Sequence, residues 1–267
     1  MFDLARLAAH LDGLGRVLLG YSGGVDSALL AVAGAKLPGA GRFLAVLGVS
    51  PSLAASQHRQ ALALAARFAI PLLELNTREL DDSRYVANPT NRCYFCKQEL
   101  WARLGEVASA RGYDTVIDGT NAEDLGDHRP GLAAASERKV RSPLAELGWT
   151  KAQVRAAARS LDIPIWDAPS SPCLSSRIRY GIEVTPARLR QVEAAEEWLR
   201  GMGVTGDLRV RHLGGAARIE VDPVHFDLLS RRWPEVERAL LDLGFAAVEQ
   251  DPRGYRRGGL LALARSG

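Results

Sequence analysis

The feature that most constrains the fold is an alternation of short apolar runs with longer segments of helical periodicity. The apolar runs cover residues 15–21, 41–50, 71–77 and 113–121, and a fifth short strand is expected within residues 137–148. Near-continuous apolar runs are typical of parallel strands that are covered on both faces. The alternation therefore predicts right-handed crossovers and an α/β fold with a doubly wound parallel sheet, whose ligand lies beyond the carboxyl ends of the strands.

The intervening segments carry helix signals of their own. Helical spacing is present in residues 52–70, in residues 93–112, where Gly112 is expected to end the helix, and in residues 150–163, where Thr150 is expected to cap it. The first 15 residues are expected to form an amphipathic helix.

A glycine-rich turn follows the first apolar run. Residues 17–31 read VLLGYSGGVDSALLA, so a buried strand leads through a short loop into a helix. This arrangement presents backbone N–H groups and a helix dipole to a phosphate. The loop is too short for a Walker A motif and has no lysine after its second glycine. An ordinary tight turn would explain the glycines but not the two serines and the acid beside them, so we expect a nucleotide site in which the phosphates are bound by Ser22, Gly23, Gly24 and Ser27, with Asp26 placing Mg²⁺.

The alternation of apolar runs and helical segments ends near residue 162. Residues 162–185 are polar and contain three prolines and a single cysteine, Cys173. A strong amphipathic helix over residues 186–203 follows, and short strands are expected at residues 207–214, 216–222, 245–251 and 258–264. We predict two domains, residues 1–184 and a small α+β domain over residues 185–267.

The three cysteines suggest metal or redox chemistry. Cys93 and Cys96 are three residues apart at the start of a predicted helix, just after a cap at Thr90 or Asn91, and a helix N-terminus favours the thiolate. With Cys173 they could hold a four-iron cluster that has one open iron, or a zinc ion with a fourth ligand such as His128. A redox disulfide between Cys93 and Cys96 and a buried structural role for a single cysteine are the other readings.

Charge and hydropathy limit the classes of partner that this chain is expected to bind. The net charge of +3 over 267 residues gives little support to nucleic-acid binding. No apolar run approaches the roughly 18 residues that span a bilayer, and the N-terminus does not read as a signal peptide, so a cytoplasmic protein is expected.

Four motifs carry a family resemblance. YSGGVDS, residues 21–27, resembles the pyrophosphatase (PP) loop of the adenylating ATPases that include GMP synthetase, NAD synthetase and the tRNA thiolases, which cut ATP between the α and β phosphates. NRCYFCK, DGTNAEDLGDHRPG and PCLSSRIRYG together resemble one branch, the LarE-type sulfur insertases of nickel-pincer nucleotide biosynthesis. The resemblance covers most of the chain and implies an adenine nucleotide alpha hydrolase-like PP-loop domain.

The resemblance also implies a reaction. Its substrate is pyridinium-3,5-biscarboxylic acid mononucleotide, whose carboxylates become thiocarboxylates after adenylation by ATP and Mg²⁺. Cys173 matches the sulfur-handling cysteine, which is sacrificed and left as dehydroalanine in relatives that have only that cysteine. This sequence departs from those relatives because it adds Cys93 and Cys96, like members that bind a [4Fe–4S] cluster as a reloadable sulfide carrier.

Further site residues come from matching positions. The nucleotide is expected to be lined by residues of the loops after neighbouring strands: Ser50, Gly119, Thr120, Asn121, Asp124 and Arg129. The substrate phosphate is expected at Arg177 and at Arg209 and Arg211, which alternate on one strand and so share a face, with Glu197 orienting the site. A solvated strand face and an exposed helix carboxylate are the ordinary alternatives for the last three.

Two other function classes stay open at this point. An iron–sulfur tRNA thiolase shares the loop and the cysteine arrangement but needs a broad basic surface. A nucleotide-binding module would bind ATP without releasing pyrophosphate. The resemblance implies a small-molecule nucleotide substrate and a homo-oligomer, and other enzymes of nickel-pincer synthesis are expected partners.

Overall fold

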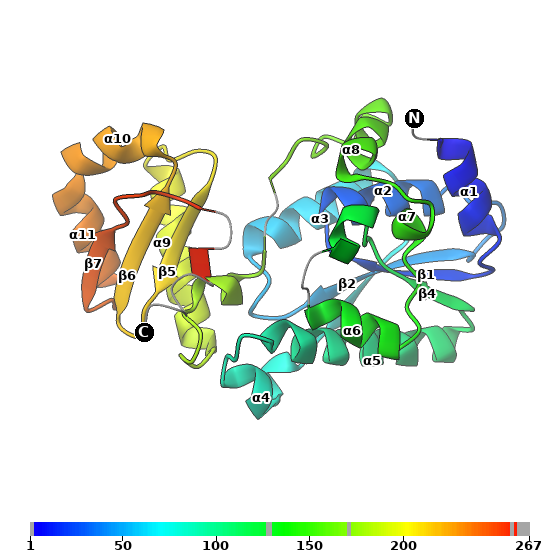
Figure 1. Cartoon of the computed structure of the whole chain (residues 1–267), viewed down its shortest axis with the longest axis horizontal. Coiled ribbons are helices and arrows are strands. Elements are labelled where there is room, and N and C mark those ends of the chain that lie inside the picture. Colours follow the sequence, from blue (N-terminus) through cyan, green and yellow to red (C-terminus); the bar gives the residue numbers. More distant parts are fainter. Residues whose placement is uncertain (1–2, 127–129, 170–171, 257–258, 261–267) are drawn as a thin grey trace. The chain divides into compact units, whose positions relative to one another are not determined.

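The computed structural model of the chain describes residues 3–126, 130–169, 172–256 and 259–260 (Figure 1). The chain divides into two compact units, and each is described by itself. The first unit comprises Met1–Ser50, Ala55–Glu79 and Asn91–Ser171, and the second comprises Pro51–Ala54, Leu80–Thr90 and Pro172–Gly267.

A parallel sheet of four strands forms the centre of the first unit. Its strands are β1 (Val17–Tyr21), β2 (Phe43–Val49), β3 (Leu72–Asn76) and β4 (Thr115–Ile117), in the order β3-β2-β1-β4. β1 pairs with β2 from Val17 opposite Phe43 to Tyr21 opposite Leu47. Because all four strands run the same way, the loops that follow them share one edge of the sheet.

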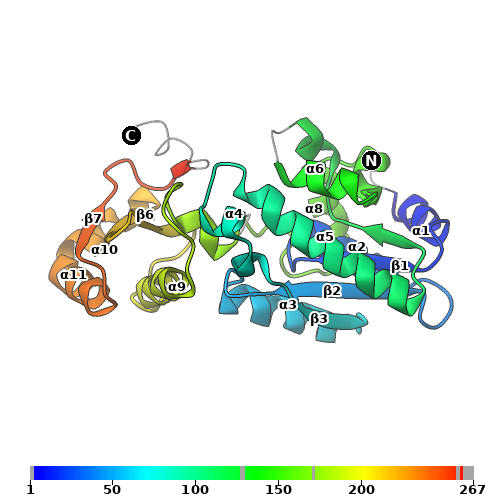
Figure 2. The same ribbon diagram turned by 90° about the horizontal axis from the view of Figure 1, so that it is seen from below.

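Helices cover both faces of this sheet. Figure 1 shows α5 (Arg92–Arg111) and α6 (Pro130–Glu137) along one face, and α1 (Leu4–Asp12), α2 (Val25–Gly34) and α8 (Lys151–Ser160) along the other. Figure 2 shows α5 crossing β1 and β2, and α3 (Ala55–Arg67) lies beside β3. Trp101 and Leu104 of α5 pack on Leu18 and Val46 of the sheet. The doubly wound fold predicted from the apolar runs is therefore confirmed.

Two of the predicted helix ends are also confirmed. Gly112 ends α5 with a φ of 67°, in the left-handed region that glycine adopts without a steric penalty. Thr150 caps α8 through a reciprocal pair of hydrogen bonds with Gln153.

The predicted fifth strand is wrong in extent. Residues 137–148 contribute a single parallel bridge, between Arg141 and Ile117. Two residues later Pro143 begins the short helix α7 (Pro143–Glu146). Proline has no N–H for a strand ladder and fits the first turn of a helix, which explains why the strand stops there.

The second unit has its own sheet and core. Strands β5 (Leu208–His212) and β6 (Ala216–Val221) are antiparallel, and β7 (Ala247–Gln250) is parallel to β6. The helices are α4 (Ser83–Val86), α9 (Pro186–Gly201), α10 (Phe226–Arg231) and α11 (Trp233–Asp242). Leu199 of α9, Val210 of β5 and Leu240 of α11 are buried in one apolar core. The small α+β domain is thus confirmed, although Gly259 and Leu260 of the last expected strand are helical and residues 261–264 lie outside the described residues.

The second unit also includes segments from earlier in the chain. Residues 51–54, 80–90 and 172–184 belong to it by their contacts. The predicted domain boundary between residues 184 and 185 concerns domains that fold and function separately, and it stays a prediction.

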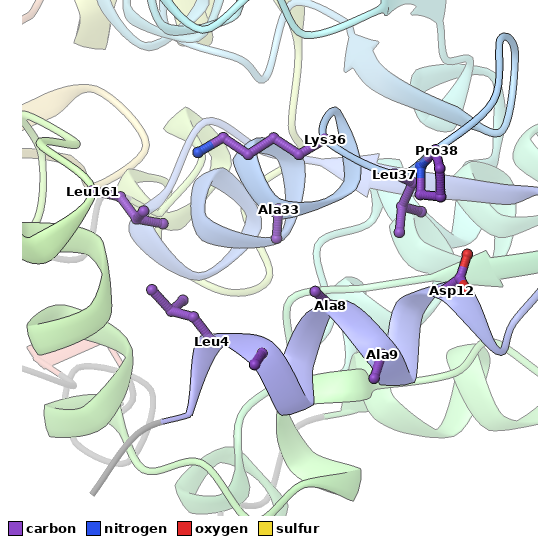
Figure 3. Close-up of a pocket in the computed structure, with 10 residues that line it drawn as sticks. Leu4, Ala8, Ala9, Asp12, Ala33, Lys36, Leu37, Pro38 and Leu161 are labelled. Carbon is purple, nitrogen blue, oxygen red and sulfur yellow. The ribbon is translucent and has the colours of Figure 1, made fainter.

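One hollow of about 510 Å³ lies beside α1 in the first unit (Figure 3). It is lined by residues that include Leu4, Ala8 and Asp12 of α1, Lys36 and Leu37 after α2, and Leu161 after α8. It adjoins the C-terminal end of α2, whereas the glycine loop is at the N-terminal end.

None of the helices in the described ranges is both long and apolar enough to cross a membrane.

Candidate active site

The loop between β1 and α2 is held by its own serines. The Ser22 hydroxyl lies 3.0 Å from the Ser27 hydroxyl, and the Ser22 amide donates to Ser27 Oγ at 3.2 Å. Ser27 Oγ donates to the Gly24 carbonyl at 3.0 Å. Gly23 has a φ of 73°, and a Cβ there would lie 2.8 Å from Ala61 of α3. Glycine is therefore required at this position for both conformation and space.

The N-terminus of α2 has no side-chain cap. Gly24 is the N-cap residue and has no side chain with which to cap the first turn. The amides of that turn and the helix dipole consequently face the edge where the strands end. Ser22, Gly23, Gly24, Asp26 and Ser27 all lie in this loop and first turn, as the sequence predicted.

Asp26 is bound by two side chains from distant parts of the chain. Lys151 Nζ contacts Asp26 Oδ2, and Asn121 Nδ2 donates to Asp26 Oδ1 at 3.2 Å. The Asp26 and Lys151 side chains are 20% and 34% exposed, so both are reachable from solvent. Lys151 is the first residue of α8, and its amide donates to Glu123 Oε1 at 3.2 Å. Sequence reasoning missed Lys151 because no local pattern relates it to a residue 125 positions earlier.

The loop after β4 approaches α2 closely. A Cβ at Gly119 would lie 2.9 Å from the Ser27 amide nitrogen, so only glycine allows this approach. The Asn121 amide donates to Asp124 Oδ2 at 3.1 Å, and the Thr120 amide donates to Asp118 Oδ1 at 3.0 Å. The expected residues Gly119, Thr120, Asn121 and Asp124 therefore lie in one folded loop. Arg129 and the alternative zinc ligand His128 lie outside the described residues.

The loops after β2 and β3 meet through Ser50. Its hydroxyl donates to Glu79 Oε1 at 2.5 Å, and Glu79 is only 2% exposed. The sequence predicted Ser50 at the edge of the sheet where the nucleotide is expected, but it did not predict Glu79 as the partner of Ser50. A polar residue two positions after the end of a predicted strand was the available signal.

The cysteines belong to both units. Cys93, which is exposed, and half-buried Cys96 lie at the start of α5 in the first unit. Cys173 is half-buried and precedes a 3-10 turn, η3 (Leu174–Arg177), in the second unit. Within the part of the chain that the structure describes, no group of three or more His, Cys, Asp and Glu side chains is arranged to hold a metal ion. The convergence of the three thiols stays a prediction.

Arg177 holds the Cys173 loop. Its Nε and Nη2 donate to the two carboxylate oxygens of Glu196 at 2.9 and 3.1 Å. Its Nη1 donates to the carbonyls of Pro172 and Cys173 at 2.5 and 3.0 Å. The guanidinium is buried, so this bidentate ion pair is well shielded from water.

Two further buried arginines lie on β5. Arg211 donates through Nε and Nη2 to Glu220 Oε2 at 2.9 and 2.7 Å, and through Nη1 to the Ser176 carbonyl at 2.9 Å. Arg209 lies over the ring of Tyr255, with its guanidinium carbon 5.2 Å from the ring centroid. Burial lowers the pKa of Arg209, and the neighbouring charge of Arg177 lowers it further. Arg177 and Arg211 are each paired with a glutamate, and an anion beside Arg209 would favour its charged form.

The carboxylate paired with Arg177 is Glu196, which the sequence did not predict, and the role expected for Glu197 in orienting the site stays a prediction. Glu196 also accepts the Val210 amide at 3.0 Å, whereas Glu197 is exposed. Helical periodicity was the signal that could have identified it, because Glu196 is four residues after Val192 and three before Leu199, and both are buried.

Comparisons with known proteins cover nearly the whole chain. Residues 6–111 match the NAD synthase family. An uncharacterised protein of Synechocystis is 42% identical over 259 residues, 96% of each chain. The pyridinium-3,5-bisthiocarboxylic acid mononucleotide synthase of Lactiplantibacillus plantarum is 34% identical over 254 residues, 95% of this chain and 92% of that protein. An uncharacterised protein of Methanocaldococcus jannaschii is 29% identical over 233 residues, 87% of this chain and 88% of that one.

These similarities extend through both units, well beyond the PP-loop region that the NAD synthase family shares. The similarity to the Lactiplantibacillus protein over almost its full length shows that this chain belongs to the LarE family of PP-loop proteins.

Proposed function

We propose that the chain is an ATP-dependent sulfurtransferase that converts the carboxylates of pyridinium-3,5-biscarboxylic acid mononucleotide to thiocarboxylates. The observation that carries this proposal is the convergence of Asp26, Lys151 and Asn121 at the open N-terminus of α2. The name of the Lactiplantibacillus relative, a bisthiocarboxylic acid mononucleotide synthase, supports the substrate class.

The loop after β1 would bind the phosphates of ATP. Its amides and the α2 dipole favour a dense negative charge, and Lys151 supplies the positive charge that a Walker lysine provides elsewhere. The Lys151 ammonium can bind either the Asp26 carboxylate or a phosphate oxygen. Asp26, whose side chain is 20% exposed, is the residue that would place Mg²⁺, which neutralises phosphate charge when bound.

The chemistry has two steps. A substrate carboxylate oxygen attacks the α-phosphorus of ATP, the bond from that phosphorus to the bridging oxygen breaks, and pyrophosphate leaves. A sulfur nucleophile then attacks the carbonyl carbon of the mixed anhydride, and AMP leaves with the original oxygen. Lys151 would stabilise the charge that grows on pyrophosphate as it departs.

Cys93, Cys96 and Cys173 are the residues that would hold a [4Fe–4S] cluster, which would supply sulfide when bound. The donor set fits, since all three side chains are thiols and Cys93 and Cys96 lie one turn apart at an accessible helix start. Three thiols and one histidine would suit zinc equally, so the metal must be measured.

The arginine cluster of the second unit would bind the substrate phosphate. Arg209 and Arg211 are buried and lie two residues apart on β5, which is the spacing that places side chains on one strand face. Burial and, after it, the charge of Arg177 lower the pKa of Arg209, and a phosphate beside Arg209 would favour its charged form. We also propose that the protein forms a homo-oligomer, as the resemblance implies.

The decisive experiment is anaerobic reconstitution with iron and sulfide, followed by reaction with ATP, Mg²⁺ and the biscarboxylic mononucleotide. The proposal expects AMP and pyrophosphate together with a thiocarboxylate product identified by mass spectrometry. Release of ADP and phosphate would contradict the nucleotide assignment. Sulfur transfer to tRNA, with no change in the mononucleotide, would instead indicate a thiolase.

A further inference from the structure

Three buried hydroxyl groups form a closed ring in the second unit. Ser52 Oγ lies 2.8 Å from the Tyr85 hydroxyl, the Tyr85 hydroxyl lies 2.6 Å from Ser175 Oγ, and Ser175 Oγ lies 3.0 Å from Ser52 Oγ. The three residues are 4%, 1% and 0% exposed. Each hydroxyl can therefore donate one hydrogen bond and accept one within the ring.

The ring joins three separate segments beside Cys173. Ser52 belongs to residues 51–54, Tyr85 to residues 80–90, and Ser175 to the turn that begins at Cys173. A backbone bond reinforces the junction, since the Leu174 amide donates to the Ser52 carbonyl at 2.8 Å. The residue that follows Cys173 is thus fixed by main-chain and side-chain contacts together.

The same turn is held from its other side. Arg177 Nη1 donates to the Cys173 carbonyl at 3.0 Å. Cys173 is therefore bounded by fixed neighbours, while the residue itself is only half-buried. This arrangement immobilises the backbone of the cysteine and leaves part of the residue accessible.

Directional hydrogen bonds fix the position of these segments more tightly than apolar packing would. An apolar contact tolerates sliding, whereas a closed ring of hydrogen bonds fixes the relative position of all three segments. A chain that only needed to bury this junction could use apolar side chains at no cost in hydrogen bonding.

We propose that Ser52, Tyr85 and Ser175 are positioning residues that fix the Cys173 thiol as a ligand of the sulfide-carrying cluster and so place the sulfur for transfer. This inference rests on the proposed function for the transfer step itself. Adenylation does not use Cys173, so the ring affects sulfur delivery and not pyrophosphate release.

The test is the coupling ratio, which is the thiocarboxylate formed per pyrophosphate released. It is measured in Tyr85→Phe, which removes one hydroxyl and keeps the aromatic ring. With reconstituted enzyme, ATP and the biscarboxylic mononucleotide, pyrophosphate release stays within about twofold of wild type, while thiocarboxylate formed per pyrophosphate falls by about tenfold or more, because small misplacements of a reacting group are costly. An unchanged ratio in a folded Tyr85→Phe protein would overturn the inference. If wild type releases no pyrophosphate, the proposed function fails instead.

A second measurement needs no catalysis. In a Cys93→Ser, Cys96→Ser background, the alkylation rate of the remaining thiol reports on the Cys173 loop, and Tyr85→Phe should raise it. Tyr21→Phe is the matched control, since Tyr21 is also buried and donates to the Ala61 carbonyl at 3.2 Å in the first unit, so its loss should leave Cys173 alkylation unchanged.

The closed ring predicts non-additivity. Tyr85→Phe and Ser175→Ala each open it, so the double variant should have nearly the same coupling ratio as either single variant. Additive losses would show independent contacts and contradict the ring. If Tyr85→Phe fails to fold, Ser52→Ala provides the same test by removing the hydroxyl of another segment of the ring.

Discussion

Replacing Lys151 by Met should remove most of the pyrophosphate release and barely change the free energy of unfolding. Lys151 and its partner Asp26 are 34% and 20% exposed. A partly exposed ion pair contributes about 0–1 kcal/mol to stability, and Asp26 would keep its hydrogen bond from Asn121. A charge-assisted hydrogen bond to a phosphate contributes about 1.5–3 kcal/mol, which corresponds to roughly a 10- to 150-fold lower rate.

The assay measures both quantities on the same preparations. Pyrophosphate release is followed with saturating biscarboxylic substrate, and the free energy of unfolding is taken from urea titrations. Lys151→Arg keeps the charge and should retain most of the rate. Lys36→Met is the matched control, since Lys36 is exposed beyond the other end of α2 and should match wild type in both measurements. If Lys151→Met lowers stability strongly and leaves the rate unchanged, the pair is structural and the reasoning is refuted.

Three further outcomes are expected. Arg209→Ala should weaken binding of the phosphorylated substrate by about 1.5–3 kcal/mol in calorimetry, while ATP affinity is unchanged; a parallel fall in both would place Arg209 elsewhere. Cys93→Ser should lose the iron and the broad absorption of the reconstituted protein, and stoichiometric zinc in wild type would contradict a cluster. Arg141 holds the pKa of Glu146 at about 2, below its usual 4.5, so the stability that this carboxylate adds is present above pH 4.5 and lost as the pH falls towards 2. After a discount for solvent, that contribution is about 1 kcal/mol, and urea titrations should show the stability difference between wild type and Glu146→Gln disappearing over this pH range.

The fold was predictable because its signals are local. β1 and β2 are compact apolar runs, and Gly112 and Thr150 are single residues whose backbone or side chain ends or begins a helix. The exception has a local cause too, since Pro143 turned the expected fifth strand into a helix. Local apolar patterns also identified all three strands of the small sheet.

The site was predictable only where its residues follow strand ends. The loop after β1 and Gly119 were recognisable because parallel strands place such loops together. Lys151 was not, because its relation to Asp26 arises from the packing of α8 beside α2. Glu196 was not predicted, although the burial of Val192 and Leu199 fixes the helix phase that favours it.

The arginines of the second unit connect substrate binding to the cysteine loop. Arg177 binds the carbonyls of Pro172 and Cys173, and Arg211 binds the carbonyl of Ser176. Each arginine holds the loop through one part of its guanidinium, so a phosphate that draws either arginine towards itself would weaken the bonds that hold this loop. Under the proposed function, binding of the substrate phosphate therefore changes the restraint on Cys173 from one side. The hydroxyl ring holds Ser175 in place, which keeps the turn anchored while those arginine contacts change.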